Sequence, residues 1–265
     1  MTNIFDSHAH YDDERFDGDR DELLASLPER GVCAIINIGC SLERAALSLQ
    51  YADRYPYVYA TAGIHPEDVG SSDAPSLPGD YIARLRGMAA HPKLVAIGEI
   101  GLDYHYEGFD KALQQRVFIE QLELARKLDL PVVIHSRDAT GDCMAILREY
   151  RPRGVMHCFS GSGETAREVL ALGMSISFTG VVTFKNAHKA VDAALAVPID
   201  RLLLETDCPY MAPEPYRGKR CDSAMIAFTA AKLAELKGME TQALIDACTE
   251  NTRRLFGISD ALDRT

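Results

Sequence analysis

The chain has 265 residues, of which 47% are hydrophobic and 25% are charged, a composition typical of a globular protein with a sizeable core. Its formal net charge of −11 argues against a protein that coats nucleic acid through a broad basic face, but not against an enzyme that holds phosphates through metal ions. The seven cysteines form no CxxC pair, so we expect free thiols and a cytoplasmic location. No apolar run is long enough to span a membrane and the first residues do not resemble a signal peptide, so we expect no membrane association.

Short apolar or β-branched runs alternate with amphipathic stretches along the chain, which predicts strands alternating with helices. The predicted strands span residues 4–8, 33–38, 58–63, 94–99, 132–135, 154–157, 175–178 and 201–206. The predicted helices span residues 19–30, 43–54, 81–90, 111–128, 164–172, 186–196, 223–237 and 241–256. Residues 70–80, rich in Gly, Ser and Pro, are predicted to form a single loop.

Eight strand–helix units in about 250 residues are the number expected of a (β/α)8 barrel of the TIM type. A doubly wound open sheet is the competing architecture, and the lack of a GxGxxG sequence after the first strand weighs against its dinucleotide-binding form. Because no linker divides the chain, we predict an α/β fold with one barrel domain over residues 1–265.

The first predicted strand leads into "DSHAH", which places two histidines one residue apart near the start of the chain. Side chains of a strand alternate between two faces, so Asp6, His8 and His10 are predicted to share one face. Three polar groups on one face of a strand end are costly in a core and well suited to a metal site.

Polar side chains end several other predicted strands in the same way, and the carboxyl ends of barrel strands meet at one rim. The candidate metal ligands on this rim are His8, His10, Glu99, His135, His157 and Asp207. Each of them alone has a plainer explanation as a hydrogen-bonded structural residue, a helix cap or a solvated loop residue. Their coincidence on successive strand ends needs a common cause, and a metal ion removes the cost of burying them.

Imidazoles with carboxylates suit borderline ions such as Zn²⁺ or Mn²⁺, while the harder Mg²⁺ prefers oxygen ligands. Six ligands exceed the needs of one tetrahedral ion, so we predict one or two divalent ions (Zn²⁺, Mn²⁺ or Mg²⁺) with Glu99 as the bridge. One ion would bind His8, His10 and Asp207, and the other His135 and His157. A water activated by the metal would be the nucleophile, with Asp207 as its general base.

The segments "DSHAH", "GIHP", "IGEIGLDY", "PVVIHSRDA", "HCFSG" and "LLLETDCPYMAP" together closely resemble the TatD family of metal-dependent deoxyribonucleases, within the amidohydrolase superfamily. The resemblance extends from Phe5 to about Phe256. It implies a TIM-type barrel, one or two divalent ions and hydrolysis of DNA phosphodiesters, with exonuclease action known in the family. It also implies that the same six side chains are the metal ligands. One segment departs from the family pattern, because "YRGKRCDSAM" has Cys221, Asp222 and Ser223 where Asn, Glu and Pro are usual.

Further residues near the strand ends are candidates for contact with a substrate. Cations and imidazoles can donate hydrogen bonds to phosphate, and the candidates of this kind are His65, Arg137, Lys185, Arg217, Lys219 and Arg220. Aromatic rings can stack on the bases of single-stranded or frayed DNA ends, and the candidates are Tyr104, Tyr106, Phe109 and Phe159. Glu205, two residues before Asp207, is predicted to orient a metal-binding histidine. Turn formation, ion pairing and packing are the structural alternatives for all of them.

Two other functions compete with the deoxyribonuclease. An amidohydrolase that cleaves an amide or an aminoacyl ester would use the same metal site, although relatives of that kind often carry a carboxylated lysine on the fourth strand, where this chain has Glu99. A barrel that binds a ligand without catalysis should have lost metal ligands, and none is missing here. We therefore favour a metal-dependent hydrolase, an exonuclease on DNA, and infer no obligate protein partner.

Overall fold

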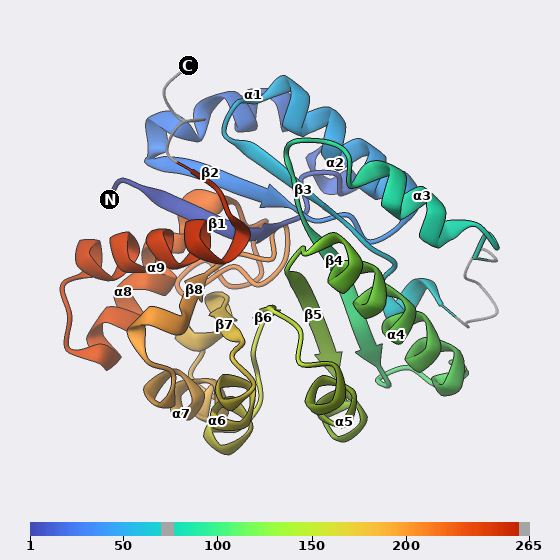
Figure 1. The fold of residues 1–265 in the computed structure, drawn as a ribbon. Coiled ribbons are helices and arrows are strands. Elements are labelled where there is room, and N and C mark those ends of the chain that lie inside the picture. Colours follow the sequence, from blue (N-terminus) through green and yellow to red (C-terminus); the bar gives the residue numbers. More distant parts are fainter. Residues whose placement is uncertain (70–76, 260–265) are drawn as a thin grey trace.

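The computed structural model describes residues 1–69 and 77–259, and it confirms the predicted TIM-type barrel; part of the predicted loop at residues 70–80 lies outside these ranges. Eight parallel strands pair with one another in chain order. The strands are β1 (Ile4–Ala9), β2 (Val32–Asn37), β3 (Val58–Ala62), β4 (Leu94–Asp103), β5 (Val132–Arg137), β6 (Gly154–Met156), β7 (Ser175–Phe178) and β8 (Leu202–Leu204). Figure 1 shows the helices packed around the outside of these strands.

The helices follow the strands as the sequence periodicity predicts, with a few differences. They are α1 (Arg20–Ser26), α2 (Leu42–Arg54), α3 (Tyr81–Met88), α4 (Lys111–Leu128), α5 (Thr140–Tyr150), α6 (Gly163–Ala171), α7 (His188–Ala196), α8 (Ile226–Lys237) and α9 (Thr241–Phe256). No helix was predicted where α5 lies. The predicted helix over 19–30 divides into α1 and the 3-10 helix η2 (Pro28–Arg30), because Pro28 cannot donate the backbone hydrogen bond that would continue α1. The predicted helix over 223–237 begins with the 3-10 helix η6 (Ser223–Met225).

Buried apolar side chains form an inner and an outer cluster. The inner cluster joins Phe5, Tyr59, Val133 and Leu203, which come from strands on different sides of the barrel, so it fills the barrel interior. The larger outer cluster joins the strands to the surrounding helices. Among the described helices, none is long and apolar enough to cross a membrane.

The first strand and the segment after the last strand form the seam of the barrel. Ala9 and Cys208 make a parallel bridge there. The backbone N–H of Asp207 donates to the His8 carbonyl, and that of His10 donates to the Cys208 carbonyl, each over 2.9 Å. The backbone of three predicted metal ligands therefore closes the barrel.

Candidate metal centre

The six predicted metal ligands lie together where the strands of the barrel end. A pocket of about 620 Å³ opens onto His10, Glu99, His135, His157 and Asp207. His8, the sixth ligand, is fully buried, and its ring stacks on that of His157 with centroids 3.9 Å apart. Residues from both ends of the chain and from its middle thus share one site.

The first donor group lies across the seam of the barrel. His8 Nε2 lies 3.1 Å from His10 Nε2, and each of them faces Asp207 Oδ1, at 3.6 and 3.2 Å respectively. His8 Nε2 is also 3.4 Å from Glu99 Oε2. Donor atoms bound at about 2.0–2.1 Å to a tetrahedral ion lie about 3.3 Å from one another, so these atoms fit the ligand set of one ion.

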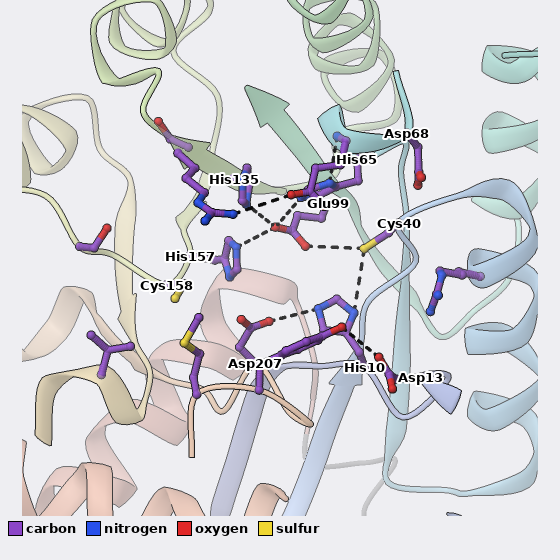
Figure 2. Close-up of a pocket in the computed structure, with 18 of the residues that line it drawn as sticks. His10, Asp13, Cys40, His65, Asp68, Glu99, His135, His157, Cys158 and Asp207 are labelled. Carbon is purple, nitrogen blue, oxygen red and sulfur yellow. Dashed lines mark hydrogen bonds and ion pairs between the residues drawn. The ribbon is translucent and has the colours of Figure 1, made fainter. Parts of the chain in front are cut away.

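The second donor group surrounds the other oxygen of Glu99. His157 Nε2, His135 Nδ1 and His65 Nε2 lie 2.7, 3.0 and 3.5 Å from Glu99 Oε1. Figure 2 shows Glu99 among these three rings, with His10 and Asp207 farther down in the view. Glu99 Oε2 faces His8 and Oε1 faces the other three imidazoles, so this carboxylate could serve both donor groups if two ions were bound.

Glu99 is the charge around which the histidines gather. Burial alone would raise its pKa, but the charges of His157, His65 and His8 hold the pKa of Glu99 well below its usual value. Burial opposes a charge on His157 as well, yet Glu99 raises the pKa of His157 well above its usual value. Burial lowers the pKa of His8, and the positive charge of His157 lowers it further. The floor of the pocket therefore attracts positive charge, which a divalent ion can supply in place of protons.

Carboxylates behind the donor groups hold the rings in place. His135 Nε2 lies 2.8 Å from Asp103 Oδ2, and His157 Nδ1 lies 3.6 Å from Glu205 Oε1. Glu205 is held in turn by the hydroxyl of Ser177, which donates to Oε2 over 2.7 Å. A hydrogen bond such as that between Asp103 and His135 fixes the tautomer of a metal-binding imidazole, whereas Glu205 faces His157 at ion-pair distance only. Sequence reasoning singled out Glu205 and missed Asp103, which the period of two in an extended β4 would have placed on the face of Glu99.

Cys40, which lines the pocket, is a second residue of the site that sequence reasoning missed. Its Sγ lies 3.6 Å from Glu99 Oε2 and 4.0 Å from His10 Nδ1. Its position two residues after the predicted strand over 33–38 was the available signal, but a lone cysteine there gave no reason to prefer a site over the core.

The prediction that Asp6 shares a face with His8 and His10 is wrong. The pairing of β1 with β2 shifts register between Asp6 and Ala9, which breaks the simple alternation of faces. Asp6 is fully buried and accepts hydrogen bonds from Thr206 Oγ1 at 2.6 Å and from Ser223 Oγ at 2.7 Å. Burial raises its pKa to about 7. Asp6 therefore ties β1 to the segments that follow β8.

The segment that departs from the family pattern has a structural place in this chain. Ser223 supplies the hydroxyl that donates to Asp6. Asp222 accepts two hydrogen bonds of 2.9 Å from one guanidinium nitrogen of Arg30 and caps η6, and Cys221 is fully buried. These three residues thus stabilise the fold beside the seam.

The predicted substrate contacts separate into two groups. His65 and Arg137 line the pocket. The others, which are not among the described residues that line it, are Lys185, Arg217, Lys219 and Arg220. Arg220 makes a two-pronged ion pair with Asp19, and the guanidinium of Arg217 lies 4.3 Å from the ring centroid of Phe184.

The predicted stacking residues also separate. Tyr106 lines the pocket, with 52% of its surface exposed. Phe159 is buried, with its ring edge-on to that of Phe178. Tyr104 and Phe109 are not among the described residues that line the pocket.

Comparison with known proteins identifies the family. A family model described as "TatD related DNase" matches residues 5–257. The chain is 40% identical to "Uncharacterized metal-dependent hydrolase YabD" of Bacillus subtilis over 259 residues, which cover 97% of this chain and 100% of that protein. It is 37% identical to "3'-5' ssDNA/RNA exonuclease TatD" of Cronobacter sakazakii over 263 residues, covering 96% and 97%.

A solved structure agrees with these matches. The crystal structure of YjjV, a TatD homolog from Escherichia coli, aligns with a TM-score of 0.89 and 32% identity, covering 97% of this chain and 99% of that one. Since the family match spans nearly the whole chain and the fold is the same, the chain belongs to the TatD-related family and is a metal-dependent hydrolase.

Proposed function

We propose that the protein is an exonuclease that removes nucleotides from the 3′ end of single-stranded DNA or RNA. The observation that carries the proposal is that Arg44 and Arg137 line the same pocket as the donor groups around Glu99. Guanidinium groups bind phosphate oxygens in a two-pronged geometry, and a phosphodiester substrate offers such oxygens. The relative from Cronobacter carries this substrate and polarity in its name.

The two arginines are supported differently. Arg44 donates from Nη1 to Asp12 Oδ2 over 2.7 Å, and Asn37 donates to the other oxygen of Asp12 over 3.0 Å. Arg137 lies 3.9 Å from Glu67 across a longer ion pair. The side chains of both arginines are nearly half exposed, so each keeps donors for a phosphate at the mouth of the pocket.

The reaction divides between the ions and the side chains of the pocket. The residues that would hold the ions are His8, His10, Glu99, His135, His157 and Asp207. Bound ions supply Lewis acids that polarise a phosphoryl oxygen and lower the pKa of water. Burial alone would raise the pKa of Asp207, but its hydrogen bond with His10 and the charge of His8 lower it. Asp207 is therefore ionised and can accept the proton that the attacking water loses.

The test uses metal-stripped protein and 5′-labelled strands of DNA and RNA, single-stranded and duplex. Mg²⁺, Mn²⁺ or Zn²⁺ is added back to the wild type and to Glu99→Ala. We expect a ladder of strands shortened from the 3′ end, restored by metal. In Glu99→Ala the rate should fall by at least about 1,000-fold, because the carboxylate that faces both donor groups is lost.

If protein with measured bound metal leaves every strand intact, the nuclease proposal fails, and an amide or aminoacyl ester becomes the substrate to test. A metal requirement for that reaction would keep the hydrolase and change only its substrate. Cleavage of DNA alone or RNA alone would narrow the proposal to one nucleic acid.

A further inference from the structure

The mouth of the pocket carries large exposed side chains that metal chemistry does not need. Tyr106, Tyr210 and Met211 line the pocket and are 52%, 44% and 39% exposed. Exposed apolar groups that gather at one concave site usually mark a binding surface. Tyr210 has the most fixed surroundings of the three.

Tyr210 is held at three points beside the metal centre. Its backbone N–H donates to the carbonyl of Asp207 over 2.9 Å, so a single turn places the ring next to that ligand. Its hydroxyl donates to Asp13 Oδ2 over 3.1 Å. The guanidinium carbon of Arg15 lies 3.9 Å from the ring centroid, and Arg15 Nε donates to Asp13 Oδ1 over 3.1 Å.

This arrangement leaves one part of the ring for a ligand. Arg15 covers one face of Tyr210, Asp13 fixes its hydroxyl, and the exposed remainder borders the pocket. A ring already held in one position loses little conformational freedom when a flat group stacks on it. The bases of nucleic acid are flat groups of this kind. In a duplex only the outer face of the terminal pair is free, whereas an unpaired base at the end of a single strand can turn either face to the ring.

We propose that Tyr210 is the stacking platform for the base next to the scissile phosphate, with Arg15 and Asp13 as positioning residues for the ring. The inference rests on the proposed nuclease function and deepens it. Stacking accepts every base, and a base that lies between its neighbours in a duplex has no free face to offer. The platform therefore accounts for a preference for single strands without a preference for sequence.

The chain offers a matched control in the same segment. Tyr216 is 42% exposed, close to the value for Tyr210, and it is not among the described residues that line the pocket. Its ring lies 5.1 Å from that of Phe228 on α8. A general effect of losing an exposed tyrosine after β8 would appear in both variants, whereas base stacking involves Tyr210 alone.

The experiment compares two labelled single strands that differ only at the 3′ end. One has ordinary nucleotides and the other has two terminal residues without bases. The wild type with metal should have the lower KM for the ordinary strand. Tyr210→Ala should raise that KM by between about 5-fold and about 100-fold and should remove most of the difference between the strands. Tyr216→Ala should behave as the wild type.

Two further variants separate stacking from folding. Tyr210→Phe keeps the ring and loses the bond to Asp13, so it should retain more discrimination between the strands than Tyr210→Ala. Tyr210→Leu keeps apolar volume without a ring and should lose the discrimination. Thermal unfolding of each variant identifies the folded ones, on which KM is compared.

Two outcomes separate a failure of the Tyr210 platform from a failure of the exonuclease proposal. If folded Tyr210→Ala and Tyr210→Leu discriminate between the strands as the wild type does, the platform is overturned and the exonuclease stands. If the wild type with bound metal shortens neither strand, the exonuclease proposal fails and the platform fails with it.

Discussion

The floor and the rim of the pocket are built in different ways. The floor consists of the six predicted metal ligands, which lie on the strands or shortly after them and are mostly buried. The rim consists of Arg44, Arg137, Tyr106 and Tyr210, which are largely or partly exposed. The backbone of the strands and of the seam positions the floor, whereas ion pairs and hydrogen bonds between side chains far apart in the chain hold the ends of the rim residues. We therefore expect the barrel to set the chemistry and a few exposed side chains to set the substrate.

After the loss of a metal ligand itself, the largest effect is expected from Asp103, which lies behind the floor of the pocket. Asp103→Asn keeps the size of the side chain but removes the charge that faces His135 Nε2 at 2.8 Å. We expect metal affinity to fall by about 10- to 100-fold, measured by competition with a chelator. Asp138→Asn is the control, since Asp138 also lies 2.8 Å from a histidine, His105, but in an exposed pair. Equal losses in both variants would contradict the role of Asp103.

A smaller effect, on stability rather than affinity, is expected from the support of the seam. Ser223→Ala removes the hydroxyl that donates to Asp6 over 2.7 Å and contacts Tyr11 Oη at 2.8 Å. Losing a partner of a buried carboxylate should lower the free energy of unfolding by about 1–3 kcal/mol, measured in urea with a chelator present. Ser26→Ala, which removes only a bond to the Leu23 carbonyl at the end of α1, should cost less. If Ser223→Ala lowers the free energy of unfolding no more than Ser26→Ala does, the hydrogen bond between Ser223 and Asp6 is not what stabilises the seam.

The smallest expected effect belongs to the rim. Arg137→Ala should raise KM for a single strand by about 5- to 10-fold and lessen the dependence of binding on salt by about one charge, with kcat little changed. Arg148→Ala removes an exposed arginine on α5 that pairs with Glu168 and should leave KM unchanged. A fall in kcat without a rise in KM would assign Arg137 to the floor and would break the distinction between the two regions.

The floor was predictable from the sequence because the carboxyl ends of all the strands of a barrel meet at one end of the barrel. Glu99, His135 and His157 needed only the correct strand positions, and the predicted strands overlap those of the structure. Asp103 was missed because β4 continues past Glu99, and Asp6 was misplaced because a register shift in β1 breaks the alternation of faces. Both errors concern the exact path of a strand, which composition does not encode.

The rim was much less predictable. Tyr210 is defined by its contact with Asp13, 197 residues away in the chain, and no local pattern indicates such a pair. The basic run near residue 220 suggested free cations at the mouth of the pocket, but Arg220 forms an ion pair with Asp19. Side chains in loops take their positions from distant partners, so their roles have to be found in three dimensions.

The seam of the barrel has a consequence for the synthesis and folding of the protein. His8 and His10 are synthesised long before Asp207, whose backbone N–H pairs with the His8 carbonyl and whose carboxylate faces the ring of His10. A nascent chain that stops before β8 lacks both the closure and this part of the site. We therefore expect the donor group of His8, His10 and Asp207 to form only when the first and last strands of the barrel meet.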